Sequence, residues 1–399
     1  MQGQSKQLEH NSMGKKNFQE DNVYVASKKR IEYCFKNYDK VCVSFSGGKD
    51  STAVLNVALE VAKEMGKLPL DVMFFDEEAL HPPTIEYVHR ISKNPDVNML
   101  WLCMEWKHRN ACSNESPYWY CWDKDNKDLW VRELPETAIT EHKRFKKGQA
   151  FQDFSAYYYE KSVGSVCYLT GIRTEESLRR MSVICSKQND NYIQSSATWN
   201  SVMAHPIYDW SSKDVWLAVH KFGWDYNKTY DVYNKTKLYQ KYLTQRVCPP
   251  FGEEPLRGLW LYSECFPELW HKMLHRVPGV ATAWRYGNTE IYSSPKTKPD
   301  HLTFKEYLQV ILKSYSKQYQ NEIKKTLNGY IRRHTNKSSD EIPEEDAHLL
   351  TGISWKFLCR CVMRGDFKGR QINAINNEAI KARDKAGMSI REAEIKHGK

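Results

Sequence analysis

The sequence predicts a protein of the α/β class, in which a sheet of mainly parallel strands with flanking helices is followed by a mainly helical C-terminal domain. Apolar segments of strand length alternate with helical segments through most of the first 240 residues, which is typical of parallel sheets with right-handed crossovers. Beyond about Tyr242 the strand pattern fades. A turn with two adjacent glycines joins the first expected strand to its helix.

Each expected element has its own local signal. Apolar, β-branched segments such as KVCVSF predict buried strands, at residues 40–45, 70–75, 98–103 and 165–170. Apolar residues at helical spacing, together with capping residues and closing glycines, predict helices at residues 23–37, 52–65, 84–92, 212–222, 304–315, 354–364 and 377–386. Residues 106–130 show no clean period and are expected to form an irregular insertion. Its aromatic residues either stack on bases or, as we favour, pack in the core: Tyr118, Trp119, Tyr120 and Trp122.

Length and composition favour a large folded protein. The 399 residues are 41% hydrophobic and 27% charged, which excludes wholesale disorder. We expect a flexible leader at residues 1–21, a nucleotide-binding domain at 22–245 and a basic helical domain at 246–399. No apolar stretch is long enough to span a bilayer and no export signal is present, so a cytoplasmic protein without a membrane partner is expected.

The net charge of +10 is concentrated near the C-terminus. Residues 301–399 hold 19 Lys and Arg against 12 Asp and Glu, a surplus of seven. Such asymmetry suggests contact with nucleic acid or another polyanion, the alternative being a set of solvated helix faces.

The cysteine pattern disfavours an iron–sulfur cluster or a zinc site. None of the eleven cysteines belongs to a Cys-x-x-Cys pair. Cysteines that could still converge in space are Cys112, Cys121, Cys248 and Cys265. His271 and His275 have zinc-binding spacing on an expected helix, but without a third ligand we interpret them as exposed side chains.

The hexapeptide SGGKDS, residues 46–51, is the most informative segment. Two glycines between a buried strand and a helix let the backbone turn tightly and approach a ligand. The helix start offers unpaired amides and a positive dipole end, and Lys49 adds a full charge. This combination suits phosphate or sulfate. It is not a Walker A loop, because Val43 stands where that motif has glycine and Asp50 follows the lysine.

The loop resembles the PP-loop of the adenine nucleotide α-hydrolases, in particular the phosphoadenosine phosphosulfate (PAPS) reductase superfamily, which implies a Rossmann-like sheet. Three further segments resemble the family in the same order: Phe75-Asp76 through Pro82-Pro83-Thr84, GIRTEESLRR at residues 171–180, and the "P-x-x-W … D-V-W" element from Pro206 to Trp216. The resemblance implies binding of ATP or PAPS, probable use of Mg²⁺, and reaction at the α-phosphorus. The implied nucleotide- and phosphate-binding residues are Ser46, Gly47, Gly48, Lys49, Asp50, Ser51, Asp76, Arg173, Glu176, Ser177 and Arg180.

Within this set, Lys49, Arg173 and Arg180 are the expected catalytic cations, because they could stabilise charge on the departing oxygens. A helix starting near Thr174 would place Arg173, Ser177 and Arg180 on one face. Several roles stay open. Asp50 could position Mg²⁺ or cap its helix; Asp76 could contact adenosine or act structurally; Glu176 could orient an arginine or help hold a metal; and the whole segment could be a surface salt-bridge network.

The chain departs from the sulfate-reducing members of the family, since it lacks their C-terminal Glu-Cys-Gly-(Ile/Leu)-His segment. The leading hypothesis is therefore cleavage of ATP between the α- and β-phosphates. The alternatives are sulfonucleotide reduction with another thiol, such as Cys265 or Cys359, and a nucleotide-responsive regulator with little turnover. The last follows from segments at residues 246–262 and 354–367 that resemble the immunoglobulin-binding regulator A type of coactivator, which implies a ParB/sulfiredoxin-like partner.

Overall fold

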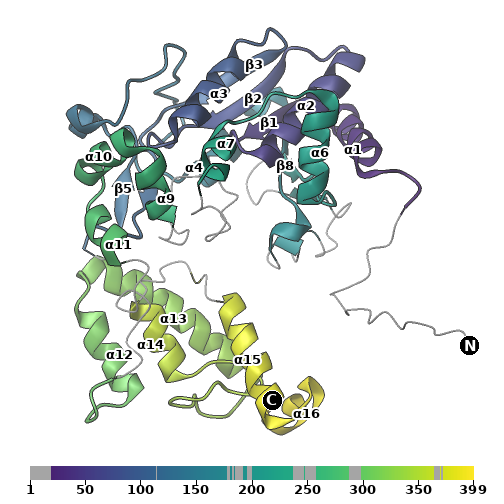
Figure 1. Ribbon diagram of the computed structural model, residues 1–399. Helices are drawn as coiled ribbons and strands as arrows, with labels where there is room; N and C mark the ends of the chain where they lie inside the picture. Colours follow the sequence, from purple (N-terminus) through teal and green to yellow (C-terminus); the bar gives the residue numbers. More distant parts are fainter. Residues whose placement is uncertain are drawn as a thin grey trace, which may run out of the picture. The chain divides into compact units, whose positions relative to one another are not determined.

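A computed structural model describes residues 19–113, 115–177, 180–181, 184, 192–195, 200–236, 247, 258–286, 298–363, 369 and 372–399 (Figure 1). The chain forms two compact units. The first contains residues 1–73, 92–99 and 159–226, and the second contains residues 74–91, 100–158 and 227–399. The units do not follow the predicted boundary between residues 245 and 246, because residues 74–91 and 100–158 cluster with the C-terminal helices. In the described parts of the chain, no helix is both long and apolar enough to cross a membrane.

A six-stranded sheet confirms the predicted fold class. Its strand order is β3-β2-β1-β6-β8-β7. β1 pairs with β6, and β6 with β8, in parallel, whereas β7 is antiparallel to β8. The strands are β1 (Lys40–Phe45), β2 (Leu70–Phe75), β3 (Val97–Leu102), β6 (Val166–Leu169), β7 (Ile193–Ser195) and β8 (Ser201–Ala204). All four predicted strands are present to within a residue at either end.

Helices α1 (Val23–Asn37), α2 (Lys49–Glu64) and α6 (Ser212–Phe222) belong to the first unit, where α2 packs against both α1 and α6 (Figure 1). The residues expected to bury α2 are all buried: Val54, Leu55, Ala58, Val61 and Ala62. The helix begins three residues earlier than predicted. The predicted capping of α6 is confirmed, since Ser211 and Asp214 form a capping box and Gly223 closes the helix at a φ of 63°.

The insertion is more ordered than predicted. Within the second unit it forms the antiparallel pair β4 (Lys107–Arg109) and β5 (Tyr118–Tyr120) and the 3₁₀ helix η1 (Lys124–Leu129). The short α4 (Phe151–Phe154) follows later in the chain. Trp119 and Trp122 are buried, with 5% and 1% of their surface exposed. The guanidinium groups of Arg276 and Arg132 lie 5.3 and 4.7 Å from the centroids of these two rings. Trp119 and Trp122 therefore pack in the core.

The rest of the second unit is helical, as predicted. Its described helices are α3 (Pro82–Ser92), α7 (Thr229–Asn234), α9 (Gly258–Cys265), α10 (Pro267–Arg276), α11 (Val280–Tyr286), α12 (Phe304–Lys313), α13 (Lys317–Lys337), α14 (Trp355–Met363), α15 (Ile372–Ala386) and α16 (Ile390–His397). The predicted capping box of Thr303 and Glu306 starts α12. A hydrophobic cluster joins α12, α13 and α14 through residues such as Leu308, Leu327 and Leu358. His271 and His275 are exposed on α10, as expected.

His81 is a neutral buried imidazole in this unit. No part of it is exposed, its Nδ1 lies 3.1 Å from the carbonyl oxygen of Val247, and its Nε2 lies 2.5 Å from the hydroxyl of Tyr233. Since a carbonyl can only accept, Nδ1 donates and Nε2 accepts. Burial lowers the pKa of His81 to about 3.

Acid should therefore destabilise the protein below about pH 6.5. In that range the unfolded chain takes up a proton on His81 that the folded chain cannot, so stability is full at higher pH and falls toward pH 3, at most about 1.4 kcal/mol per pH unit for this group. Urea unfolding at a series of pH values measures the slope. H81Q should flatten it, whereas the exposed-histidine control H271Q should leave it unchanged. Equal slopes in wild type and H81Q would contradict the prediction.

Candidate functional site

The SGGKDS loop turns from β1 into α2 through its glycines and serines. Gly47 has a φ of 71°, a conformation that costs side chains with a Cβ. The amide of Ser46 donates to Oγ of Ser51 over 3.2 Å, and Oγ of Ser51 donates to the carbonyl of Gly48 over 2.9 Å. These bonds close the loop on itself. The N-cap residue, Gly48, has no side chain and therefore gives α2 no side-chain cap.

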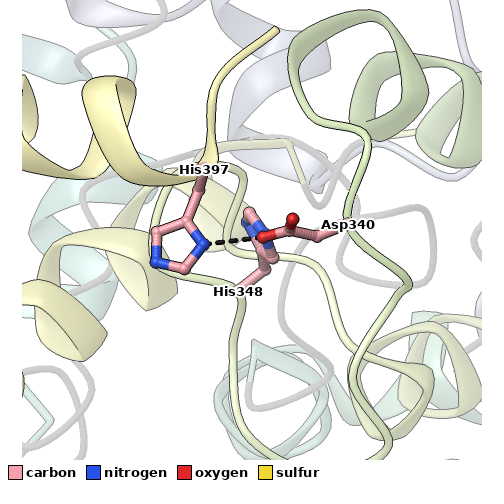
Figure 2. A group of neighbouring side chains, drawn as sticks. All are labelled: Asp340, His348 and His397. Carbon is pink, nitrogen blue, oxygen red and sulfur yellow. Dashed lines mark hydrogen bonds and ion pairs between the residues drawn. The ribbon is translucent and has the colours of Figure 1, made fainter.

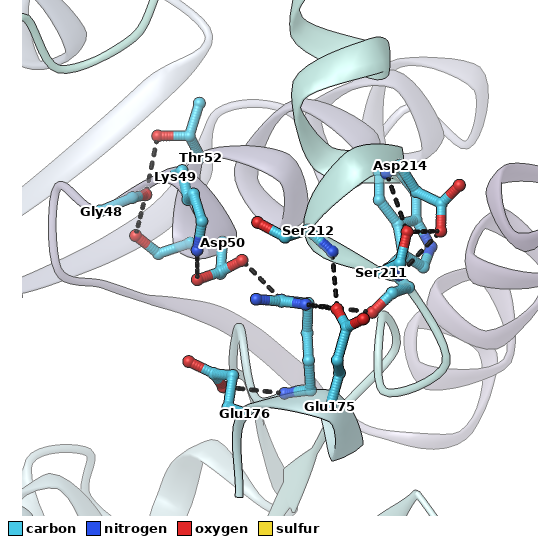
Figure 3. Close-up of polar contacts among 12 residues, drawn as sticks. Gly48, Lys49, Asp50, Thr52, Glu175, Glu176, Ser211, Ser212 and Asp214 are labelled. Atoms are coloured by element: carbon cyan, nitrogen blue, oxygen red, sulfur yellow. Dashed lines mark hydrogen bonds and ion pairs between the residues drawn. The ribbon is translucent and has the colours of Figure 1, made fainter. Parts of the chain in front are cut away.

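Three charged side chains lie together at the start of α2 (Figure 3). Nζ of Lys49 lies 2.8 Å from one carboxylate oxygen of Asp50, and Nε of Arg173 lies 2.7 Å from the other. Lys49 and Arg173 are buried, with 4% and 3% of their surface exposed. Burial lowers the pKa of Lys49, while the Asp50 charge opposes that shift. The sequence predicted this group of residues, and Asp50 joins the two cations instead of capping its helix.

The segment after β6 differs from the predicted single helix. Thr174–Glu176 forms a short 3₁₀ turn, and Ser177 is extended, with φ −169° and ψ 153°. The prediction that Arg173, Ser177 and Arg180 lie on one helix face is therefore wrong. The physical reason is that Glu176 turns back to accept from the amide of Arg173, which closes the turn after three residues.

Ser177 accepts two backbone hydrogen bonds from residues that follow it and so positions Arg180. Its Oγ accepts from the amide of Arg180 over 3.2 Å, and its carbonyl accepts from the amide of Met181 over 3.0 Å. The Arg180 guanidinium pairs with Glu176, which confirms the arginine-orienting alternative for that carboxylate. The Arg180 side chain is 37% exposed, against 4% for Arg173. Of the two arginines, Arg180 is thus the one that can reach a ligand.

The "P-x-x-W … D-V-W" element supports the site. The carbonyl of Trp210 accepts from Nη1 of Arg173 over 3.2 Å, and the carbonyl of Tyr208 accepts from the amide of Thr174 over 2.9 Å. Asp209 binds both terminal nitrogens of Arg30 at 2.8 Å, which ties the element to α1. These contacts hold the Arg173 segment in place through its backbone and its guanidinium.

Sequence reasoning missed the support that Glu175 provides. Its carboxylate accepts from Arg173 over 3.0 Å and from the amide of Ser212, the first residue of α6, over 2.8 Å (Figure 3). Glu175 therefore fixes the buried arginine and the helix start together. A glutamate two residues after the arginine of GIRTEE was the available signal.

His205 was also missed. It follows β8 directly, is fully buried, and its Nδ1 lies 2.5 Å from Oγ1 of Thr170, at the end of the neighbouring β6. Its Nε2 is also buried, and no described residue forms a hydrogen bond with it. Burial lowers the pKa of His205 to about 4, and the charge of Arg180 adds to the shift. His205 is thus neutral at pH 7. A histidine just before the "P-x-x-W" element was the signal in the sequence.

Asp76, in the second unit, is fully buried and already has four donors. One oxygen accepts from the amide of Glu78 over 2.9 Å and pairs with Arg132. The other accepts from Nε1 of Trp101 over 2.7 Å and from the thiol of Cys103 over 3.6 Å. The side chain of Asp76 therefore has a structural role, and its geometry does not support a contact between this carboxylate and adenosine.

The carboxylate of Asp50 does not fit a Mg²⁺ ion in this arrangement. Both oxygens of Asp50 face cations, and the carboxylates of Glu175 and Glu176 each accept from an arginine. Hard cations such as Mg²⁺ require carboxylate or phosphate oxygens that are free to bind them. The predicted Mg²⁺ role of Asp50 would break one of its ion pairs, and we derive no chemical step from it.

The candidate thiols of Cys112, Cys121, Cys265 and Cys359 are poor nucleophiles. Burial raises the pKa values of Cys265 and Cys359 to about 11 and that of Cys112 to about 12. Burial also raises the pKa of Cys121. A reactive cysteine requires the opposite shift, since the thiolate is the attacking species. Cys248 lies outside the described residues.

One group of possible metal ligands occurs in the described part of the chain: Asp340, His348 and His397, whose ligand atoms lie within 4.8 Å of one another (Figure 2). Nδ1 of His348 accepts from the amides of Leu350 and Thr351 over 3.3 and 3.2 Å. Nε2 therefore carries the proton and donates to Asp340 over 3.1 Å. A metal on Nε2 would displace that proton. The hydrogen bonds of His348 therefore favour a hydrogen-bonded group of side chains over a metal site.

The sheet, with a phosphate-type loop between a strand and a helix and an arginine segment after the next paired strand, defines a PP-loop protein with a nucleotide-binding fold. Comparison with known proteins agrees. The phosphoadenosine phosphosulfate reductase domain family matches residues 40–236, and the domain of unknown function DUF3440 matches residues 240–345. The chain belongs to the PAPS reductase superfamily and carries DUF3440 as an additional C-terminal domain.

Individual relatives span different parts of the chain. The uncharacterized protein YbdN of Escherichia coli (strain K12) is 30% identical over 379 residues, covering 88% of this chain and 90% of its own. The phosphoadenosine 5'-phosphosulfate reductase of Vibrio vulnificus (strain CMCP6) is 23% identical over 243 residues, covering 60% of this chain and 81% of its own. The crystal structure of Candida glabrata FMN adenylyltransferase aligns with a TM-score of 0.34 at 14% identity, covering 52% of this chain and 57% of its own.

Proposed function

We propose that the protein binds an adenine nucleotide, most simply ATP, and cleaves it between the α- and β-phosphates. The observation that carries this proposal is the uncapped start of α2, beside Lys49 and within one unit with Arg173 and Arg180. Helix amides and buried cations together bind phosphate oxygens. Family membership supports the ligand class, because phosphoadenosine phosphosulfate, from which the family takes its name, is an adenine nucleotide.

The chemistry follows from the charges. An acceptor oxygen or water attacks the α-phosphorus, the bond to the bridging oxygen breaks, and pyrophosphate leaves with that electron pair. AMP is transferred to the acceptor or released. Negative charge grows on the departing oxygens, and preorganised donors stabilise it more in the transition state than in the ground state. Lys49 and Arg180 supply that stabilisation, while Arg173 holds Asp50 and the loop in position.

The products test this directly. The purified protein is incubated with ATP labelled at the α- and γ-phosphates, with Mg²⁺, and with candidate acceptors in parallel. AMP or an adenylylated acceptor, together with pyrophosphate, is the expected result. ADP with inorganic phosphate as the products would refute the proposal.

Lys49→Ala and Arg180→Ala should each weaken nucleotide binding while the fold stays intact. Each removes one charge-assisted phosphate contact, which costs on the order of 1.5 to 3 kcal/mol of binding free energy, or about 10- to 150-fold in Kd. Isothermal calorimetry with ATP measures the affinity.

Lys63→Ala is the matched control, because it removes one exposed positive charge at the far end of the same helix. Its Kd should equal that of the wild type at moderate salt. If Lys49→Ala and Arg180→Ala also bind ATP as the wild type does, the cations do not contact phosphate and the site is placed incorrectly.

Sulfonucleotide reduction is the weaker alternative. The raised pKa values of Cys265 and Cys359 leave either thiol protonated at neutral pH. Thioredoxin-dependent sulfite release from PAPS would favour reduction, and a Cys→Ser variant that abolished this release would identify the thiol. The coactivator role and the ParB/sulfiredoxin-like partner stay predictions from the finer resemblance.

A further inference from the structure

Helix α13 has two faces of opposite character. Ile323, Leu327, Tyr330 and His334 are buried, and the first three belong to the hydrophobic cluster of the C-terminal helices. The other face is exposed at positions three or four residues apart and is wholly polar: Asn321, Lys324, Lys325, Asn328, Arg332 and Thr335. One helix therefore anchors itself in the core and presents a polar stripe to solvent.

The stripe lines a hollow. A cavity of about 700 Å³ has as its described lining the six stripe residues with Gly329 and Ile331. Gly329 lies in the middle of the helix, and a Cβ placed on it would meet no atom within 4 Å. Glycine costs stability at such a position. Its missing side chain here leaves open space beside Lys325 and Arg332.

The charges in the stripe are not neutralised by described residues. Lys324, Lys325 and Arg332 are exposed and form no ion pair with any side chain in the described ranges. The stripe contains no carboxylate, and the single acidic residue of the helix, Glu322, is occupied by the hydroxyl of Tyr118 over 2.8 Å. The side-chain amide of Asn328 lies between the cations along the helix and can donate to the same oxygens.

This arrangement fits a nucleic-acid backbone better than other anionic partners. The stripe spans 15 residues, or about 21 Å from the first to the last, and each nucleic-acid strand carries one phosphate per about 3.4 Å of axis. A row of donors on a rigid helix can therefore meet several phosphates. A lipid surface is a poor match, because the apolar face of α13 is already buried and cannot insert.

We propose that the polar stripe of α13, residues 321–335, is a binding surface for the phosphate backbone of nucleic acid. Binding is independent of base sequence, because no aromatic residue in the described lining is placed to stack on bases. The proposal does not depend on nucleotide cleavage at the loop site.

Fluorescence anisotropy with labelled duplex DNA, duplex RNA and single strands of mixed sequence tests it on the full chain. For DNA, log K should fall with log salt with a contribution of about −2.7 from three phosphate contacts. The triple variant Lys324→Ala/Lys325→Ala/Arg332→Ala should bind at least about tenfold more weakly and lose most of that slope.

Two controls distinguish an effect of the stripe itself from an effect of the total charge of the protein. Lys313→Ala/Lys385→Ala/Lys396→Ala removes the same charge from exposed positions outside the stripe and should change affinity less than about threefold. Gly329→Leu fills the hollow without changing charge and should weaken binding, while circular dichroism shows a retained fold.

The outcomes are decisive in both directions. Equal losses in the two triple variants, or unaltered binding in Gly329→Leu and the stripe triple, would overturn the proposal. Binding to anionic vesicles or to an acidic peptide without binding to nucleic acid would also overturn it. ATP affinity, measured on the same stripe variants, should stay at the wild-type value, so failure here is distinct from failure of the proposed nucleotide site.

Discussion

Gly171→Ala should weaken ATP binding on the order of a hundredfold while costing only about 1–3 kcal/mol of stability. A Cβ on Gly171 would lie 2.8 Å from the carbonyl carbon of Asp50 and 2.8 Å from the amide nitrogen of Ser51. Both are backbone atoms in the first turn of α2, so they cannot rotate away as a side chain can. The helix start must shift, and the amides that face the ligand shift with it. A displacement of about 1 Å in such a site costs on the order of a hundredfold in function.

Gly223→Ala is the matched control in the same unit. Gly223 has a φ of 63° and closes α6, but a Cβ on it would meet no atom within 4 Å. Alanine there costs about 1 kcal/mol through backbone strain alone. For the two variants, calorimetry measures the affinity for ATP and urea unfolding measures the free energy of unfolding. Together they distinguish a change in the site from a loss of stability. If Gly171→Ala binds ATP as tightly as Gly223→Ala does, the GIRTEE segment does not set the position of the loop.

Arg276→Ala should destabilise the second unit by about 3–5 kcal/mol, the largest stability change we predict. Arg276 donates to both oxygens of Glu78 at 2.8 Å, and the Glu78 side chain is fully buried. Glu78 also accepts from the amides of Trp122 and Val131, so its charge stays in place when the arginine is removed. An unpaired buried carboxylate is the physical cause of the loss.

A double-mutant cycle identifies the pair as the cause. Glu78→Gln/Arg276→Met removes both charges and should be less destabilised than the two single changes added together. Lys124→Ala is the control, since Lys124 pairs with Glu141 at an exposed position and its loss should cost less than about 1 kcal/mol. Thermal or urea unfolding measures the stability of each variant. A loss in Arg276→Ala no larger than in Lys124→Ala would contradict the prediction.

The loop site is close to electroneutral before any ligand binds. Lys49, Arg173 and Arg180 are balanced by Asp50, Glu175 and Glu176 within a network of direct ion pairs. Buried cations without partners would be costly, so the carboxylates hold them in their charged form. An incoming phosphate therefore competes with the carboxylates for Lys49 and Arg180. We expect the affinity to depend on how readily these cations exchange a carboxylate partner for the phosphate, because the site has little net positive charge.

Local patterns determined much of the fold. The apolar spacing in residues 52–62, the capping pair Ser211 and Asp214, and the closing Gly223 act within one element or its ends, so their consequences are visible in the chain itself. The same holds for the SGGKDS turn, where glycine chemistry and the strand–helix context together indicate a phosphate loop.

Only the tertiary structure decided how the site residues divide their work. Both Arg173 and Arg180 lie in the same sequence motif, which does not distinguish their roles. In the structure Arg173 is enclosed by Asp50, Glu175 and a carbonyl, while Arg180 stays partly exposed. Likewise, three of the four donors around Asp76 come from residues far away in the chain, namely Trp101, Cys103 and Arg132, and a neutral His205 follows from burial. Burial and long-range ion pairs depend on residues far apart in the chain, and spacing along one segment carries no information about them.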